Sequence, residues 1–157
     1  MRIVADLTKG TLSVNGAAFR VSCSVKTLRD GTRRSDDVKR SIPDDKPYDT
    51  RPFPKGLWNV TGVEWRKKYG FDPYTYGPVK IRTDAWQYVN VWELDKDGDY
   101  LRETSRQVRD SGYLLHYSVS TTTLGCIRLA SAEDAEMIGE IIERLLGRGE
   151  AVQVEVV

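Results

Sequence analysis

Hydrophobic and polar positions alternate with a period of two at both ends of the chain. Near the N-terminus the apolar members of this alternation are Ile3, Ala5, Leu7, Leu12, Val14, Phe19, Val21, Cys23 and Val25. Asn15-Gly16 separates two of these runs, and this dipeptide is typical of a tight turn between antiparallel strands. The pattern therefore predicts an N-terminal β-hairpin. The segment 151–157 alternates in the same way and predicts a closing strand.

Aromatic and β-branched runs predict three more strands in the middle of the chain, over residues 56–62, 79–82 and 87–92. Between the first two, glycines and prolines at 69–78 predict a loop. The acidic segment Asp95–Asp99 superficially resembles a calcium loop, but Arg106 stands where that motif needs a glutamate. We therefore expect an Asp-Gly turn between two strands.

One segment carries the pattern of a helix. Ser131 is a suitable N-cap, and Asp134 places an acid at the third helical position. An apolar stripe at helical spacing follows, made of Ala135, Ile138, Ile141, Ile142 and Leu145. Gly147 is a plausible end of this helix. The fold class predicted from these patterns is mostly β, with one main α-helix packed on the strands.

The long segment from about 26 to 55 is rich in Asp, Arg, Lys and Pro and has few large apolar residues. It predicts a long exposed loop, which is either functional or a solvated insertion without a role. A chain of 157 residues is the size of one hydrophobic core, so residues 1–157 are expected to form a single domain.

Composition narrows the functional classes. The 24 basic and 23 acidic residues give a net charge of +1, which argues against nucleic acid as a partner. Two cysteines make at most one bridge, and a single histidine rules out a site built from several imidazoles. No apolar run approaches the roughly 18 residues of a transmembrane segment.

The start of the chain has no apolar stretch of secretory length, so no signal peptide is predicted in it. Three expectations follow for its location: the chain stays where it is made, a leader was trimmed from it, or it is exported by a route that needs no leader.

The single histidine, His116, lies ten residues before Cys126. A thiol needs a nearby imidazole or cation to become a good nucleophile, and ten residues allow a strand carrying His116 to turn back beside Cys126. Gly125 permits close backbone approach, and Arg128 can favour a thiolate or hold a substrate carboxylate. If a helix follows directly, amides near Cys126 can stabilise an oxyanion. The spacing equally allows a buried structural cysteine and a core histidine.

The residues around Cys126 give evidence beyond its spacing from His116. Gly125-Cys126-Ile127-Arg128-Leu129, followed by the helix start at 131–135, resembles the signature of the L,D-transpeptidase catalytic domain, the YkuD-like family. Three other segments resemble parts of that domain in the same order, namely 3–16, 54–60 and 76–78. The resemblance covers nearly the whole chain and implies the β-sandwich or barrel of that family.

The resemblance implies a role for each matching residue. Cys126 is the acylated nucleophile, His116 its base, the amides of Gly125 and Cys126 line the oxyanion site, and Arg128 orders the site or the substrate. Ser118 or a backbone carbonyl is a candidate for orienting His116. The implied substrates are peptidoglycan stem peptides: Cys126 attacks the carbonyl of the third residue and expels D-alanine, and an amine or water then takes the acyl group. No metal or organic cofactor is implied.

Alternatives stay open within the same fold. The short segment between His116 and Cys126 favours a more water-accessible site, as in an L,D-carboxypeptidase or endopeptidase. Leu124 stands where the family has a histidine, which favours a non-catalytic wall-binding module. An enzyme of this kind acts at the bacterial cell wall, in the periplasm or outside the cell. It is then a phage wall enzyme, the product of a trimmed precursor, or an antibacterial toxin, and a toxin implies a small immunity protein as partner.

Overall fold

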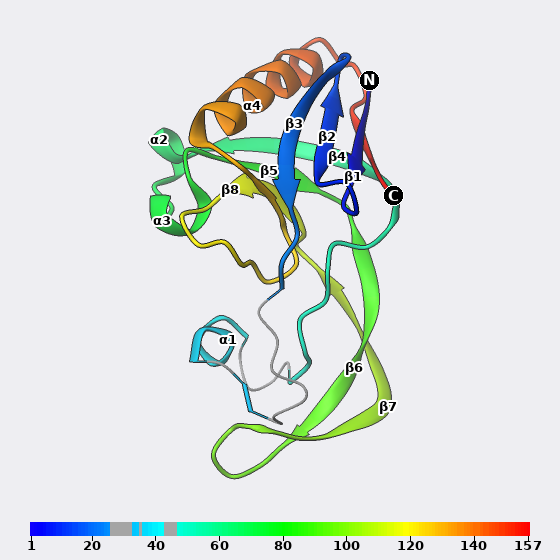
Figure 1. Cartoon of the computed structure of the whole chain (residues 1–157), viewed down its shortest axis with the longest axis vertical. Helices are drawn as coiled ribbons and strands as arrows, with labels where there is room; N and C mark the ends of the chain where they lie inside the picture. The colour runs from blue at the N-terminus through cyan, green and yellow to red at the C-terminus, as the bar shows by residue number, and fades with distance from the viewer. Residues whose placement is uncertain (26–32, 35, 43–46) are drawn as a thin grey trace.

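The computed structural model describes residues 1–25, 33–34, 36–42 and 47–157. Its larger part is a closed β-barrel, from which a long two-stranded arm extends (Figure 1). Around the barrel the strands follow the order β1 (Arg2–Asp6), β10 (Gln153–Val156), β4 (Gly56–Trp65), β5 (Val79–Thr83), β8 (Leu114–Tyr117), β9 (Ile127–Leu129), β3 (Ala17–Ser22) and β2 (Thr11–Val14). The pairs β1–β10 and β8–β9 are parallel, and the other barrel pairs are antiparallel.

The two ends of the chain form adjacent barrel strands. Asn15 and Gly16 have φ angles of 49° and 80° and join β2 to β3, which confirms the predicted hairpin turn. The predicted closing strand is β10, which lies beside β1 (Figure 1). The amino group of Met1 donates to the carbonyl of Ala151 at 2.7 Å, so the start of the chain is held beside the segment that leads into β10.

The predicted helix is α4 (Ala132–Gly147). The Ser131 hydroxyl accepts from the amide of Asp134 at 3.1 Å, which is the expected N-cap. The helix packs on β4, β5, β8 and β9, and its apolar face joins the barrel core. Fully buried members of that core are Ile3, Leu12, Ile81, Leu115, Ile127, Leu129, Ile138, Ile142 and Val154. The predicted class, mostly β with one main helix, is confirmed.

The arm consists of β6 (Trp86–Leu94) and β7 (Tyr100–Ser111), which pair with each other and not with the barrel. The turn between them is the expected Asp-Gly turn. The Asp95 carboxylate accepts from the amides of Asp97 and Asp99 at 2.9 and 3.0 Å, and Gly98 has a φ of 79°. Asp95 thus serves the turn as an acceptor for backbone amides.

The prediction of an exposed loop over 26–55 is wrong for the part of it that the structure describes; residues 26–32, 35 and 43–46 lie outside that part. Residues Asp36–Ser41 form the short helix α1, and Val38 and Ile42 are buried. These two positions share one helical face. Phe53 is buried in the barrel core, and Tyr48 pairs with Val91 on β6 of the arm. These two aromatic residues connect the charged segment to both parts of the molecule.

The predicted loop at 69–78 contains helical turns. They are α2 (Arg66–Tyr69) and α3 (Pro73–Tyr76), which are joined at Gly70 with a φ of 69°. The Asp72 carboxylate accepts from the amide of Tyr74 at 3.1 Å and caps α3, which contacts β8. These turns place Tyr74 and Tyr76 beside the strand that carries His116.

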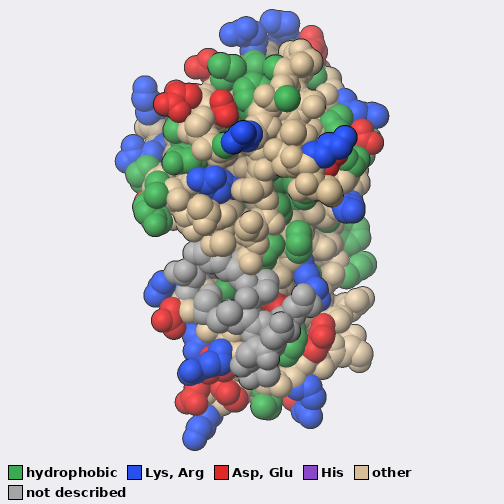
Figure 2. Space-filling view, in the orientation of Figure 1, with side chains coloured by type: hydrophobic (Ala, Val, Ile, Leu, Met, Phe, Trp, Pro, Cys, Tyr) green, Lys and Arg blue, Asp and Glu red, His purple; other side chains and the backbone are tan. Residues whose placement is uncertain are grey.

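Among the described helices, none has the length and apolar character needed to cross a membrane. On the face shown in Figure 2, basic and acidic side chains lie interspersed over the barrel end and the arm end. This mixture matches the net charge of +1.

Candidate active site

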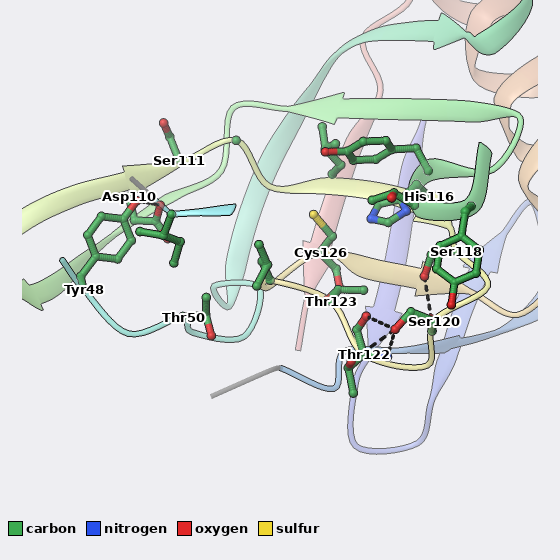
Figure 3. Close-up of a pocket in the computed structure, with 17 residues that line it drawn as sticks. Tyr48, Thr50, Asp110, Ser111, His116, Ser118, Ser120, Thr122, Thr123 and Cys126 are labelled. Carbon is green, nitrogen blue, oxygen red and sulfur yellow. Dashed lines mark hydrogen bonds between the residues drawn. The ribbon is translucent and has the colours of Figure 1, made fainter. Parts of the chain in front are cut away.

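A cavity of about 540 Å³ lies where the barrel, the base of the arm and the segment after β8 meet (Figure 3). His116 and Cys126 both line it. The other lining residues are Ile42, Tyr48, Thr50, Tyr74, Thr75, Tyr76, Asp110, Ser111, Gly112, Leu114, Ser118, Ser120, Thr122, Thr123 and Leu124. Hydroxyl groups dominate the polar part of this lining.

Strand alternation directs both candidate catalytic side chains into the cavity. Leu115 on β8 pairs with Ile127 on β9, and both side chains are fully buried in the barrel core. The neighbours of these two residues, His116 and Cys126, therefore face the other way, toward the cavity. The sequence prediction that these two residues share one site agrees with this arrangement.

The route of the chain between them differs from the expectation in two respects. β8 and β9 are parallel, so the chain does not turn back after His116 but crosses over through residues 118–126. In addition, β9 stands between Cys126 and α4, so Cys126 does not lie on a direct strand-to-helix connection. Both differences arise because parallel pairing makes the chain return to the starting end of β8 before β9 begins.

His116 is 3% exposed and has a defined tautomer. Its Nδ1 lies 3.0 Å from the carbonyl oxygen of Tyr117, which can only accept, so Nδ1 carries the hydrogen and Nε2 is the free acceptor. Burial, aided by the positive charges of Lys80 and Arg128, lowers the pKa of His116 from 6.5. The imidazole is therefore neutral at pH 7 and able to accept a proton.

Tyr76 forms a wall beside His116. The two rings meet edge to face with centroids 5.4 Å apart. The ammonium of Lys80 lies 3.8 Å from the centroid of the Tyr76 ring. Burial raises the pKa of Tyr76, so its hydroxyl stays protonated at neutral pH. Tyr76 thereby separates the cation of Lys80 from direct contact with the cavity side of His116.

Cys126 is a free thiol that is partly exposed at the cavity. Burial disfavours the charged thiolate and raises the pKa of the Cys126 thiol to about 12. A hydrogen bond from the amide of Leu114 acts in the opposite direction, because it favours the thiolate. A thiol and a neutral imidazole are therefore the ground-state forms at pH 7. In such a pair the imidazole takes the proton of the thiol while the sulfur attacks, because no thiolate–imidazolium ion pair exists beforehand.

Gly125 has a conformation that other residues rarely adopt, with a φ of +114°. A Cβ atom here would lie 2.5 Å from the carbonyl oxygen of Arg51 and 2.8 Å from the Tyr113 ring. The amide of Gly125 donates to the Thr123 hydroxyl at 3.3 Å, and that hydroxyl donates to the carbonyl of Cys126 at 2.9 Å. If the Gly125 amide is to bind an oxyanion, it must first give up its hydrogen bond to the Thr123 hydroxyl.

Cys23 makes hydrogen bonds that hold the turn at Gly125. Its thiol donates to the Gly125 carbonyl and accepts from the amide of Phe53, both at 3.3 Å. Burial raises its pKa, so it remains a protonated thiol. Sequence reasoning treated Cys23 as a core residue and gave no sign of this contact, because Cys23 and Gly125 are 102 positions apart.

Arg128 and Ser118 hold the segment after β8 and do not bond His116. Arg128 Nε donates to the carbonyl of Ser118 at 2.9 Å, and its guanidinium lies over the Tyr117 ring at 5.3 Å. Arg128 does not line the cavity, so its position fits ordering of the site and not binding of a substrate carboxylate. The Ser118 hydroxyl donates to the carbonyl of Ser120 at 2.6 Å, which leaves the Tyr117 carbonyl as the group that orients His116.

The cavity residues that sequence reasoning missed include one hydrogen-bonded pair. Tyr48 comes from the charged segment before β4, and Asp110 from the end of β7. The Tyr48 hydroxyl donates to the Asp110 carboxylate at 2.9 Å. No sequence signal could find this pair, because the two residues are 62 positions apart and meet only through the arm.

No family model matches the chain, and comparison with curated proteins and with solved structures finds no significant match. The family likeness thus depends on the sequence alone, chiefly on the residues around Cys126. Within the described residues, no group of three or more His, Cys, Asp or Glu side chains is placed to hold a metal ion.

Proposed function

We propose that the protein is a cysteine acyltransferase of the L,D-transpeptidase type that acts on peptidoglycan stem peptides. One observation supports the proposal: the only histidine of the chain, on β8, and Cys126, directly before the adjacent parallel strand β9, line one cavity, and the histidine Nε2 is free to accept a proton. The YkuD-like residues around Cys126 supply the reaction type and the substrate class.

In the first step the Cys126 sulfur attacks the carbonyl carbon of the third stem residue, and its proton passes to Nε2 of His116. The tetrahedral intermediate then collapses: the bond to the D-alanine nitrogen breaks, and His116 returns the proton to that nitrogen. The Leu114 amide favours negative charge on the sulfur before the bond forms. D-Alanine leaves, and the acyl group remains on Cys126 as a thioester.

In the second step an amine of a neighbouring stem attacks the thioester and gives a cross-link. His116 accepts the proton of this amine and returns it to the sulfur as the thioester bond breaks. Water in place of the amine gives a shortened stem, which is the L,D-carboxypeptidase outcome. The partial exposure of Cys126 and the short 118–126 segment favour this hydrolytic alternative. Product analysis of digested sacculi separates the two outcomes.

Incubation with a carbapenem, followed by intact mass measurement, tests the proposal. We expect one covalent adduct on the native protein and none on Cys126→Ala. Cys23→Ser is the matched control, because it removes the other thiol and keeps a hydroxyl that can donate to Gly125. This variant should still form the adduct. No adduct on the native protein, or an equal adduct on Cys126→Ala, would refute the proposal.

The raised pKa of the Cys126 thiol favours one other candidate, a non-catalytic wall-binding module of the same fold. A general thiol probe at neutral pH distinguishes the two. An enzyme requires Cys126 to react with this probe faster than Cys23 does. Binding of sacculi without any reaction at Cys126 would support the module. Toxicity on periplasmic but not cytoplasmic expression would identify an antibacterial toxin.

A further inference from the structure

Asp110 gives one side of the cavity a negative charge. Among the described residues it is the only acidic one in the lining, and no described lysine or arginine lines the cavity with it. In Figure 3, Asp110 and Tyr48 lie on one side of Cys126, while Ser118, Ser120 and Thr122 lie on the other. The cavity therefore has an anionic side and an uncharged, hydroxyl-lined side with the thiol between them.

Two phenols fix the orientation of this carboxylate. Tyr48 donates to one carboxylate oxygen at 2.9 Å, and Tyr113 donates to the other at 2.6 Å. Tyr113 is itself held by Gln87, whose side-chain amide donates to the Tyr113 hydroxyl at 2.7 Å. The ring of Tyr113 packs on Phe53 in the barrel core. Asp110 is thus positioned by both the arm and the barrel.

The neighbouring groups leave the charge of Asp110 unbalanced. Burial, with the nearby carboxylate, raises the pKa of Tyr48 and of Tyr113, so both phenols stay neutral donors. His116 is neutral at pH 7 for the reason given above. The charge of Asp110 also reaches the thiol, because it contributes to the raised pKa of Cys126. No lysine, arginine or histidine of the described chain lies within ion-pair distance of Asp110.

We propose that Asp110 is a specificity-determining residue that binds a free ammonium group of the substrate held at Cys126. Each carboxylate oxygen accepts one phenol and retains a lone pair for a further donor, and an ammonium supplies three donors with the opposite charge. An acylated amine has lost the charge and gained bulk, so the anionic side should reject it. This inference rests on the proposed function and narrows its substrates to stem peptides with a free side-chain amine.

Two synthetic tetrapeptides test the inference. Both end in D-alanine, and the third residue is lysine in one and Nε-acetyllysine in the other. Affinity is measured by calorimetry on Cys126→Ala, which holds the peptide without reacting. We expect the lysine peptide to bind at least about tenfold more tightly than the acetyllysine peptide, because a charged hydrogen bond in a partly buried site contributes that much. Asp110→Asn in the same background should abolish that preference.

Tyr48→Phe is the matched control, because it removes one hydrogen bond to Asp110 and keeps the negative charge. It should retain the preference for the free amine, and thermal melting confirms that each variant is folded. Equal affinity for the two peptides, or no binding of either, would overturn the inference, and this result does not depend on any variant of Asp110. The proposed function fails separately, through the absence of a carbapenem adduct on the native protein.

Discussion

The chemical properties of His116 depend on one backbone carbonyl and on burial. The carbonyl of Tyr117 holds the hydrogen on Nδ1, which leaves Nε2 as the acceptor nitrogen. Burial lowers the pKa of His116, so the imidazole remains a competent base even at mildly acidic pH. A residue that is 3% exposed and hydrogen-bonded through one nitrogen is therefore both a packed residue and a candidate base.

This environment predicts the titration of the single imidazole. We expect nuclear magnetic resonance of His116 to show a pKa below 6.5 and a neutral form with the hydrogen on Nδ1. Arg128→Gln should bring the pKa closer to 6.5, because it removes one of the two positive charges that lower it. A pKa above 6.5 in the native protein would contradict the burial argument.

The same shift links protonation to stability. As pH falls below about 6.5, the unfolded chain gains a proton that the folded chain resists, so the free energy of unfolding decreases until the lower folded pKa is passed. His116→Gln should lack this part of the acid-induced loss. Chemical denaturation at pH 7 and pH 5 measures the difference between the two proteins.

At the scale of elements, the crossover from β8 to β9 forms the site. Residues 118–126 bridge two parallel strands, and serine and threonine side chains bond the backbone inside this segment, as Ser118 and Ser120 do. Near its end, Gly125 approaches the carbonyl of Arg51 and the ring of Tyr113 so closely that a Cβ atom would not fit. Such a close passage fixes the place at which Cys126 enters the cavity.

Gly125→Ala should therefore destabilise the protein. A side chain at a positive φ costs about 1–3 kcal/mol, and a Cβ 2.5 Å from a backbone oxygen forces the turn to move as well. Gly147→Ala is the matched control, since its Cβ meets nothing within 4 Å and its backbone is not in the left-handed region. Denaturant titration should show a loss for the first variant and little change for the second. Equal stabilities would show that the turn adapts freely.

On the scale of the whole molecule, the barrel and the arm differ in how they are stabilised. The barrel closes its edges and encloses one core with α4. The arm has only two strands, and two strands alone are marginally stable in water. Its buried residues include Trp92 and Tyr100, whose ring centroids lie 5.1 Å apart. Asp110 and Tyr48, on one side of the cavity, therefore belong to the less strongly supported part.

Hydrogen exchange should reveal this difference. We expect the amides of β6 and β7 near the turn at 95–98 to exchange faster than those of β1, β5 and β8, because the outer arm opens without unfolding the barrel. Mass spectrometry of peptic fragments measures both sets in one sample. Equal protection of the two sets would mean that the arm and the barrel unfold as one unit.

Local sequence patterns were sufficient to predict several elements of the fold, but they gave a wrong prediction for the segment from 26 to 55. Asn15-Gly16 predicts its turn because both residues tolerate positive φ, and Ser131 predicts its helix start because it supplies a cap. The charged segment from 26 to 55 misled because Phe53 is buried in the barrel core and Tyr48 pairs with Val91, more than 40 positions away. Hydrophobic composition within a window carries no information about such distant partners.

The sequence by itself determined the mostly β class and the main helix and singled out His116 and Cys126 as candidates, since these follow from backbone periodicity, capping and the scarcity of imidazole and thiol groups. Only the tertiary structure decided that β8 and β9 are parallel, that the Tyr117 carbonyl orients His116, and that Tyr48 and Asp110 complete the cavity. These arrangements depend on pairings between distant segments, which are settled when the barrel closes and the arm packs against its own small core.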